Sequence, residues 1–372
     1  MEINTQRMID EFFYLVSMDS ITFHEEKVAE YLKKQLLSLG FEVTEDHAQD
    51  HYNGTANNLY GYLKGTIPGT PILFSSHMDT VEPGVHKKAV IHEDGTITSD
   101  GTTILGADDI SGIVAILEAL RIIKETQTEH RDIEVLFTIA EEAYLKGSEV
   151  FDFSMIKAKD AYVLDLSGAI GEAAITAPSL ISFQVDFYGK ESHAGFAPES
   201  GIHAIKMAAD AITKIKVGHV DSESTVNIGT ILGGTATNIV PKQCGFQGEI
   251  RSFDHRLALE NEKKIKEICE QSASAFGGCM EFQSIIHLYA YETAENSTVV
   301  RYFREATKKV GIEMKLVPTF GGSDNNNFMR HGINGIVLAC GMHNAHSCKE
   351  YTTRNDLEKC ASIVKELMIC EG

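Results

Sequence analysis

The alternation of short apolar runs with longer amphipathic segments most constrains how the first third of this chain folds. Apolar runs at 71–76, 133–139 and 161–164 predict short buried strands, and the apolar spacing of Glu25–Leu39 and Asp109–Lys124 predicts helices. Strands that alternate with helices form a mainly parallel sheet with helices on both faces. We therefore expect an α/β fold.

The pattern changes near Pro178. Residues Leu180–Tyr188 alternate apolar and polar side chains, as a half-exposed strand does. The elements predicted next are a helix at 201–215, strands at 225–232 and 243–252, a helix at 255–275 and a strand at 280–289. The order β-α-β-β-α-β is typical of a ferredoxin-like α+β sandwich.

Helix–strand alternation resumes after Thr293. A chain of 372 residues is long enough for two domains. We therefore expect a first domain formed by residues 1–177 and 292–372, and a second domain at 178–291 that is inserted into it.

Charge and cysteine content exclude several classes of protein. The chain has 33 Lys and Arg against 53 Asp and Glu, a formal net charge of −20. Such a surface repels phosphate backbones and anionic lipid heads, so we expect neither a nucleic-acid nor a membrane partner. No apolar run reaches the roughly 18 residues of a membrane-spanning helix. Seven cysteines without a CxxC pair predict reduced thiols in a cytoplasmic protein.

Four predicted strands lead, at their carboxyl ends, into side chains that bind metal ions. These side chains are His77 and Asp79, Glu141 and Glu142, Asp165, and His343 and His346, and the pair Asp108-Asp109 precedes the long helix. The carboxyl ends of parallel strands line one edge of a sheet, where open α/β folds bind ligands. Carboxylates that converge there repel one another unless cations lie between them, and His with carboxylates is the ligand set of zinc and related ions.

Each of these residues has an ordinary explanation when it is taken singly. A lone His or a Glu pair is usually solvated, and two acids before a helix usually cap it. The joint arrangement in one sheet favours a metal site. Three carboxylates and a hydroxide balance two divalent ions, and two ions about 3.5–4 Å apart can share an activated water. Asp79 lies two residues after His77 and either begins a turn or fixes the His77 tautomer.

Five segments carry these residues. They are Ser76-His77-Met78-Asp79-Thr80-Val81, Gly106-Ala107-Asp108-Asp109, Ala140-Glu141-Glu142, Val163-Leu164-Asp165 and Asn344-Ala345-His346-Ser347. In this order they resemble the di-zinc metallopeptidases of the peptidase T type. That family also contains carboxypeptidase G, aminoacylases, acetylornithine deacetylase and succinyl-diaminopimelate desuccinylase. The resemblance extends over nearly the whole chain, and it implies a zinc-exopeptidase fold.

The resemblance implies a ligand set for two divalent metal ions per chain. His77 and Asp165 would hold one ion. His346 and Glu142 would hold the other, and Asp108 would bridge the two. Zinc is the expected metal, and cobalt and manganese accept the same ligands.

The resemblance also implies roles for the acids beside these ligands. Glu141 would be the general base that takes a proton from the bridging water and delivers it to the leaving amine. Asp109 would cap the helix that it begins. Ile110-Ser111-Gly112, after the acid pair, and Ala143-Tyr144-Leu145, after the Glu pair, depart from the family pattern, so tripeptide specificity stays open.

In the inserted domain the resemblance implies a lid and dimerisation domain, and hence a homodimer. His193 would stabilise the tetrahedral oxyanion, in some relatives from the partner subunit. Asn238 and Arg251 match lid residues that grip the substrate, and a guanidinium suits a free carboxylate. Gly322 and Ser323 lie in a Gly-rich loop that would form an anion nest near the substrate carboxylate, or simply a turn.

The leading interpretation is a cytoplasmic aminopeptidase, similar to a tripeptidase, that acts on short peptides. An N-acyl amino acid deacylase or a carboxypeptidase of the same family would use the same metal site. Frameworks similar to glutamyl aminopeptidase place their extra domain between the first His and the bridging Asp, and the gap from His77 to Asp108 is too short for that. A metal-dependent binding protein on a decayed hydrolase would have lost the base or a ligand, and none is missing here.

Overall fold

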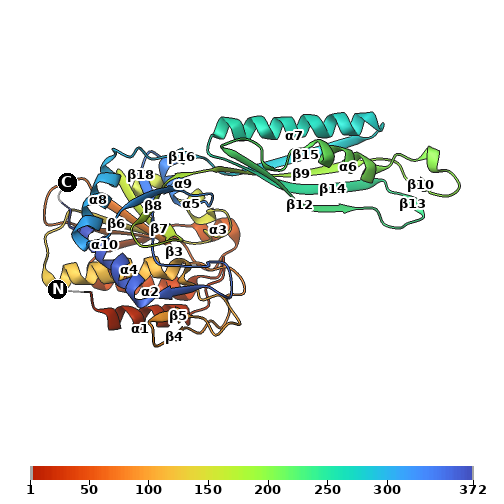
Figure 1. Cartoon of the computed structure of the whole chain (residues 1–372). Coiled ribbons are helices and arrows are strands. Elements are labelled where there is room, and N and C mark those ends of the chain that lie inside the picture. The colour runs from red at the N-terminus through yellow and green to blue at the C-terminus, as the bar shows by residue number, and fades with distance from the viewer. Residues whose placement is uncertain (1–2, 371–372) are drawn as a thin grey trace. The chain divides into compact units, whose positions relative to one another are not determined.

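The computed structural model describes residues 3–370, which form two compact units (Figure 1). The second unit is Ala177–Tyr291, and the first consists of the described chain on either side of it. None of the helices within residues 3–370 is both long enough and apolar enough to cross a membrane.

The first unit is built on a nine-stranded sheet whose centre is parallel. Its order is β1-β2-β6-β3-β7-β18-β8-β16, and β17 pairs with β8. The four central strands β6 (Ile133–Thr138), β3 (Ile72–His77), β7 (Asp160–Leu166) and β18 (Asn334–Ala339) run parallel to one another. Their carboxyl ends therefore lie at one edge of the sheet. This is the mainly parallel α/β arrangement that the sequence predicts.

The remaining elements of the first unit surround these strands. The outer strands are β1 (Glu42–Glu45), β2 (Leu59–Leu63), β8 (Glu172–Ala177), β16 (Tyr291–Glu292) and β17 (Lys315–Pro318). A small sheet contains β4 (Val90–Ile91), β5 (Thr96–Thr98) and β19 (Tyr351–Thr353). The helices are α1 (Thr5–Val16), α2 (Glu26–Leu39), α3 (Ala48–Tyr52), α4 (Ala107–Thr126), α5 (Lys146–Glu149), η1 (Phe153–Met155), α8 (Thr298–Val310), α9 (Asn325–Arg330) and α10 (Arg354–Met368).

The central strands are mostly apolar because both of their faces are buried. In β6, Val135 and Phe137 enter one core while Leu136, between them, enters the other. The first core is covered by α1, α2, α4, α8 and α10. The second is covered by shorter segments, including η1 and α9, which supplies Phe328. Helices therefore lie on both faces, with the longer ones on one side.

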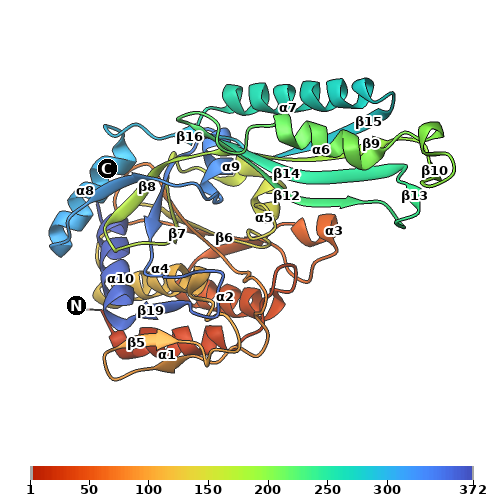
Figure 2. The same ribbon diagram turned by 45° about the vertical axis from the view of Figure 1, so that its right-hand side comes forward.

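The second unit is an antiparallel sheet with two helices on one face. Its main elements are β9 (Ser179–Tyr188), α6 (Ala204–Lys214), β12 (Ser224–Gly233), β14 (Gln243–Ser252), α7 (His255–Ala275) and β15 (Cys279–Leu288). The sheet order is β11-β12-β14-β9-β15, where β11 is Gly218–His219. Figures 1 and 2 both show α6 and α7 over the same face of the sheet. The connectivity β-α-β-β-α-β is the one predicted from the sequence.

Alternation along β9 explains how this sheet packs. Phe183, Val185 and Phe187 point into the core beneath the helices, while Gln184 between them is exposed. The predicted helix at 201–215 begins later, at Ala204, because Ile202 pairs with Lys190 in an isolated bridge and so keeps the chain extended. A short pair, β10 (Ser192–His193) with β13 (Ile239–Val240), and the turn η2 (Pro198–Ser200) complete the unit.

Candidate active site

The carboxyl edge of the parallel strands gathers the acidic and imidazole side chains that the sequence singles out. They are His77 at the end of β3, Asp165 near the end of β7, Glu141 and Glu142 after β6, Asp108 in the first turn of α4, and His346 after β18. Four adjacent strands and one helix terminus therefore converge on one place, as ligand sites of open α/β sheets do.

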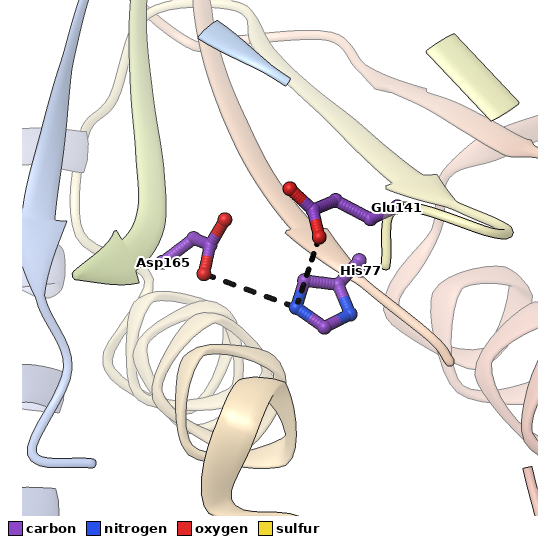
Figure 3. Close-up of side chains that lie close together, drawn as sticks. All are labelled: His77, Glu141 and Asp165. Atoms are coloured by element: carbon purple, nitrogen blue, oxygen red, sulfur yellow. Dashed lines mark ion pairs between the residues drawn. The ribbon is translucent and has the colours of Figure 1, made fainter. Parts of the chain in front are cut away.

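His77 lies in the middle of this cluster. Its Nε2 atom is 3.0 Å from Oδ1 of Asp108. The same nitrogen is 3.8 Å from Oδ1 of Asp165 and 4.0 Å from Oε2 of Glu141 (Figure 3). The other ring nitrogen, Nδ1, lies 3.0 Å from the main-chain carbonyl oxygen of Asp79. Because a carbonyl oxygen only accepts, Nδ1 carries a hydrogen and Nε2 faces the carboxylates, as in a metal-binding imidazole.

Asp108 joins His77 to a second imidazole. Oδ2 of Asp108 lies 3.2 Å from Nε2 of His346, and that nitrogen is 2.9 Å from Oε1 of Glu142. The two oxygens of one buried carboxylate therefore face two different imidazoles. A carboxylate in this position could bridge two divalent ions.

Two sets of three side chains bring ligand atoms together. In each set these atoms lie within 4.8 Å of one another, and the sets are His77 with Glu141 and Asp165, and His77 with Asp108 and Glu142. Imidazole nitrogens with carboxylate oxygens suit zinc and related divalent ions, so the residues present fit a metal centre. Glu141 belongs to one set, so the geometry admits it as a ligand as well as a base.

Burial dominates the electrostatics of the carboxylates. Burial, reinforced by repulsion between their charges, raises the pKa values of Glu141 and Asp165 well above the usual range. Burial also raises the pKa of Glu142. For Asp108 burial acts in the same direction, but hydrogen bonds with the two imidazoles bring its pKa below the usual value. The cluster therefore carries more negative charge than it tolerates without cations or protons.

Protons on the imidazoles offset part of this charge. Burial disfavours the charged form of His77, yet hydrogen bonds with Asp108 and Asp79 raise its pKa well above the usual value. Hydrogen bonds with Asp108 and Glu142 raise the pKa of His346 to about 10. Divalent cations would compensate the same carboxylates, so metal binding and protonation compete at this cluster.

Asp79 is fully buried and connects His77 to the loop that carries the Glu pair. Its Oδ1 accepts the main-chain N–H of Glu141 at 2.9 Å, and its Oδ2 accepts that of Glu142 at 3.2 Å. Oδ1 also lies 3.4 Å from Nδ1 of His77, and Thr22 donates its hydroxyl to Oδ2 at 2.8 Å. Asp79 therefore fixes the imidazole and the two glutamates together, and does not simply begin a turn.

The cluster and the fold agree with the comparison against protein families. A profile described as peptidase family M20/M25/M40 matches residues 73–369. The chain belongs to this family. As a member it is a peptide hydrolase, as the resemblance in its sequence predicts.

This M20 peptidase is similar to two solved structures over nearly its whole length. Aminopeptidase PepT from Bacillus cereus ATCC 10987 is 38% identical, with a TM-score of 0.94 and coverage of 99% of this chain and 98% of that one. A tripeptidase from Staphylococcus aureus subsp. aureus Mu50 is 35% identical, with a TM-score of 0.97 and 99% of both chains covered. The uncharacterized protein YqjE of Bacillus subtilis (strain 168) is 38% identical over 362 residues, which cover 97% of each chain.

The loop that carries the Glu pair in the M20 peptidase is clamped at both ends by Asn58, which the sequence analysis did not single out. Asn58 Oδ1 accepts the N–H of Ile139 at 2.9 Å, and its Nδ2 donates to the carbonyl of Gly147 at 2.8 Å. Asp46 holds Asn58 in turn, at 2.6 Å from Nδ2. One asparagine far from the motifs offers no local pattern that would have revealed this role.

Glu25 is a second buried residue that supports the same loop. Its Oε1 accepts the N–H of Ala140 at 3.1 Å and that of Phe23 at 2.8 Å. Burial and the nearby charge of Asp79 raise the pKa of Glu25 to about 8. Glu25 therefore holds the residue before Glu141 while carrying a carboxyl group that resists ionisation.

The cap expected of Asp109 is not formed. Helix α4 has no side-chain cap, and the backbone is non-helical at Asp108 and Asp109. This turns the buried Asp109 side chain toward β3, where its Oδ2 accepts from the Ser76 hydroxyl and, at 3.2 Å, from the N–H of His77. Burial raises the pKa of Asp109 to about 8. Asp109 therefore supports the backbone of His77.

The Gly-rich loop is anchored by Asp324 rather than left open as a nest. Asp324 is buried and accepts hydrogen bonds from the hydroxyls of Thr138, at 2.5 Å, and Ser148. The N–H of the buried Ser323 donates to the side chain of Asn326 at 3.1 Å, so that N–H is already engaged. Gly322 beside it is half-buried. These bonds tie the loop to the end of β6.

His193 lies in the second unit, where a tight turn fixes its ring. Its Nδ1 accepts the main-chain N–H groups of Gly195 and Phe196, each at 3.1 Å. A ring nitrogen that accepts carries no hydrogen, so in the neutral ring Nε2 is the donor. The His193 side chain is exposed, and the exposed ring of Phe196 lies 4.4 Å from it between centroids. This arrangement presents an N–H to solvent.

The two other predicted lid residues also lie in the second unit. Asn238 is exposed. Its main-chain carbonyl accepts the N–H of Ala194, the residue after His193, at 2.9 Å. Arg251 is on β14, where its Nε donates to Oε1 of Glu249 at 2.9 Å. The guanidinium is therefore engaged by a carboxylate of the chain itself.

Proposed function

We propose that this M20 peptidase is a two-metal aminopeptidase that releases the N-terminal residue of short peptides. The observation that carries the proposal is the position of Asp108, whose two oxygens face His77 and His346. On this reading His77 and Asp165 hold one ion, and His346 and Glu142 hold the other. Zinc is the proposed metal, and cobalt and manganese suit the same ligands.

The reaction divides between the metal centre and the chain. Two divalent ions, when bound, supply polarisation of the scissile carbonyl and activation of the attacking water. Glu141 accepts a proton from that water and delivers it to the leaving amine. Its deep burial, which raises its pKa, supports this role, because the carboxyl must hold the proton between the two transfers. Asp79 holds His77 and Glu141 in position through its Oδ1, which lies 3.4 Å from Nδ1 of His77 and accepts the main-chain N–H of Glu141.

We assign the second unit the functions of a lid and of a dimerisation domain. The N–H on Nε2 of His193 would donate to the oxyanion of the tetrahedral intermediate. Asn238 and Arg251 would contact the substrate, Arg251 through a carboxylate in place of Glu249. Gly322 and Ser323 would lie beside the substrate in the first unit.

A homodimer is supported by the edge of the sheet in the second unit. β12 pairs with β14 on one side, and on the other side, within residues 3–370, only Thr225 and Val226 of this strand pair with β11. Farther along this edge Ile231 and Leu232 are exposed. A second copy of the chain would cover these side chains and the unpaired main chain beside them.

We place the enzyme in the cytoplasm. All seven cysteines lie within the described residues and all are free, and five of them are buried. Free thiols in this number suit a reducing compartment.

The names of the two similar solved structures, an aminopeptidase and a tripeptidase, support short peptides with a free amino group as the substrate class. The test compares a tripeptide, its N-acetylated form and its C-terminal amide with the zinc-loaded enzyme. We expect release of the N-terminal residue from the tripeptide and no cleavage of the acetylated form. Release of acetate would instead identify a deacylase, and release of the C-terminal residue a carboxypeptidase.

A further inference from the structure

Glu350 holds the turn that carries the bridging aspartate. It lies just before β19 and is 1% exposed. Its Oε2 accepts the main-chain N–H groups of Leu105 at 2.8 Å and Gly106 at 2.7 Å, and its Oε1 accepts that of Asp108 at 2.9 Å. A buried carboxylate with three N–H donors forms strong, charge-assisted hydrogen bonds.

The backbone of this turn needs an external acceptor. Gly106 has a left-handed backbone with φ of 81°, and Asp108 is non-helical with φ of −82° and ψ of 101°. The first N–H groups of a helix have no partner within the helix, and here no side chain of the turn caps them. A glutamate 242 positions away from Asp108 takes this role.

Glu350 also connects the turn of Asp108 to the loop of His346. Glu350 lies four residues after His346 and donates its own N–H to the carbonyl of Ser347 at 3.0 Å. His346 faces Oδ2 of Asp108, and the N–H of Asp108 returns to Glu350. Movement of Glu350 would therefore displace Asp108 and the loop of His346 together.

We propose that Glu350 is a positioning residue for metal binding, because it fixes the carboxylate of Asp108 against His346. The inference rests on the proposed two-metal function. It applies to the group formed by Asp108, Glu142 and His346, since Glu350 bonds to the segments of two of these residues. Within residues 3–370, the strands that carry His77 and Asp165 make no hydrogen bond to Glu350.

The test uses Glu350→Gln, which keeps the size of the side chain but sets an NH2 group against N–H donors. The metal-free protein is titrated with zinc in competition with a chelating dye, without any activity assay. We expect the affinity for one of the two ions to fall by about tenfold or more, the usual effect of removing a residue that orients metal ligands. Glu350→Asp, which keeps the charge, should recover part of the loss.

Glu134→Gln is the matched control. Glu134 is also fully buried, and its two oxygens accept the N–H groups of Lys157 and Ala158, each at 2.9 Å. It lies near the amino end of β6, at the opposite edge of the sheet from the cluster. We expect this variant to lose stability while it binds both ions as the unaltered protein does. Equal weakening in both variants, or unchanged zinc affinity in folded Glu350→Gln, would overturn the proposal.

A second measurement needs no variant, and it applies if Glu350→Gln does not fold. Hydrogen exchange at the amides of Leu105, Gly106 and Asp108 is followed in the unaltered protein with and without zinc. We expect zinc to slow all three, because ordering of Asp108 tightens their bonds to Glu350. No change on saturation with zinc would contradict the inference. If the unaltered protein binds fewer than two ions, the proposed function itself fails.

Discussion

Glu142 and His346 are 204 positions apart in the sequence, yet Oε1 of Glu142 lies 2.9 Å from Nε2 of His346. The sheet brings them together, because β6 and β18 run in the same direction with β3 and β7 between them, so that their following loops meet at one edge. Asp108 completes this group, with one oxygen facing His346 and the other facing His77. Each half of the cluster therefore depends on the same aspartate.

Replacement of Asp108 by Ala is expected to cost metal in both halves of the cluster. Elemental analysis after removal of loose metal should give two ions per chain for the unaltered protein and at most one for Asp108→Ala, with loss of peptidase activity. Asp165→Ala removes a ligand from the His77 side only, and it should keep the ion on the His346 side. Two ions retained in Asp108→Ala would contradict a bridging role.

Glu141→Gln separates a general base from a ligand. If Glu141 moves protons, kcat should fall by at least about 10² while both ions stay bound. Glu141 also lies in a group with His77 and Asp165 that could hold an ion. If Glu141 is a ligand, Glu141→Gln should lose one ion. Metal content and kcat measured on the same preparation decide between them. Near-normal turnover would remove Glu141 from the mechanism.

The arrangement of the strands could be predicted because short local sequence patterns indicate each strand. Runs such as 133–139 are mostly apolar because both faces of β6 are buried, and the side chains after each strand mark the shared edge. The strand ends indicated a metal site, and the resemblance of the motifs around them to a known family indicated the peptide-hydrolase activity. Individual distances, such as the 3.2 Å between Asp108 and His346, depend on loop conformations that no periodicity encodes.

The residues that hold the site in place could not be predicted. Asn58, Glu25 and Glu350 accept hydrogen bonds from main-chain N–H groups of distant segments. Almost every residue has such an N–H group, so the sequence does not indicate which of them a side chain binds. The cap expected of Asp109 was wrong for a related reason. Two acids before a helix normally cap it, but here the backbone at both residues is non-helical and directs Asp109 to Ser76.

Glu25 should make stability fall as the pH rises. Its pKa is raised from 4.5 to about 8, so between these values the folded protein keeps a proton that the unfolded chain releases. The free energy of unfolding contributed by Glu25 therefore decreases from about pH 5 to pH 8. Glu25→Gln removes the titration, so the difference in unfolding free energy between variant and unaltered protein should move in favour of the variant across this window.

The measurement for Glu25 is urea unfolding of the metal-free proteins at pH 5 and pH 8. Glu26→Gln is the control, because a hydrogen bond with Thr55 lowers the pKa of Glu26 below 4.5. A lowered pKa of a carboxyl gives stability that is lost only below this window, so Glu26→Gln should show the same difference at both pH values. If the unfolding free energy changes equally between pH 5 and pH 8 in Glu25→Gln and in the unaltered protein, Glu25 ionises normally.

Arg251→Ala should weaken the binding of peptides with a free α-carboxylate far more than the binding of their amides. The expected loss of binding free energy is about 1.5–3 kcal/mol, the value of a charged hydrogen bond. Glu249→Gln provides the opposite change, because it removes the carboxylate that lies 2.9 Å from the guanidinium. We expect this variant to lower KM for the carboxylate peptides and to leave the amides unaffected. An equal effect of Arg251→Ala on both substrates would place Arg251 outside the substrate site.

The homodimer and the role of His193 can be tested in one experiment. His193 belongs to the second unit, and all the proposed metal ligands belong to the first, so a shared site would take the imidazole from one subunit and Glu141 from the other. Glu141→Gln and His193→Ala are each expected to be inactive as pure dimers. After dissociation and reassociation, a mixed dimer would carry one site with both changes and one site with neither, and activity should return. The control mixes each variant with itself through the same cycle. An active monomer in sedimentation, or no recovery despite subunit exchange shown by mass-labelled chains, would mean that His193 acts within its own chain or not at all.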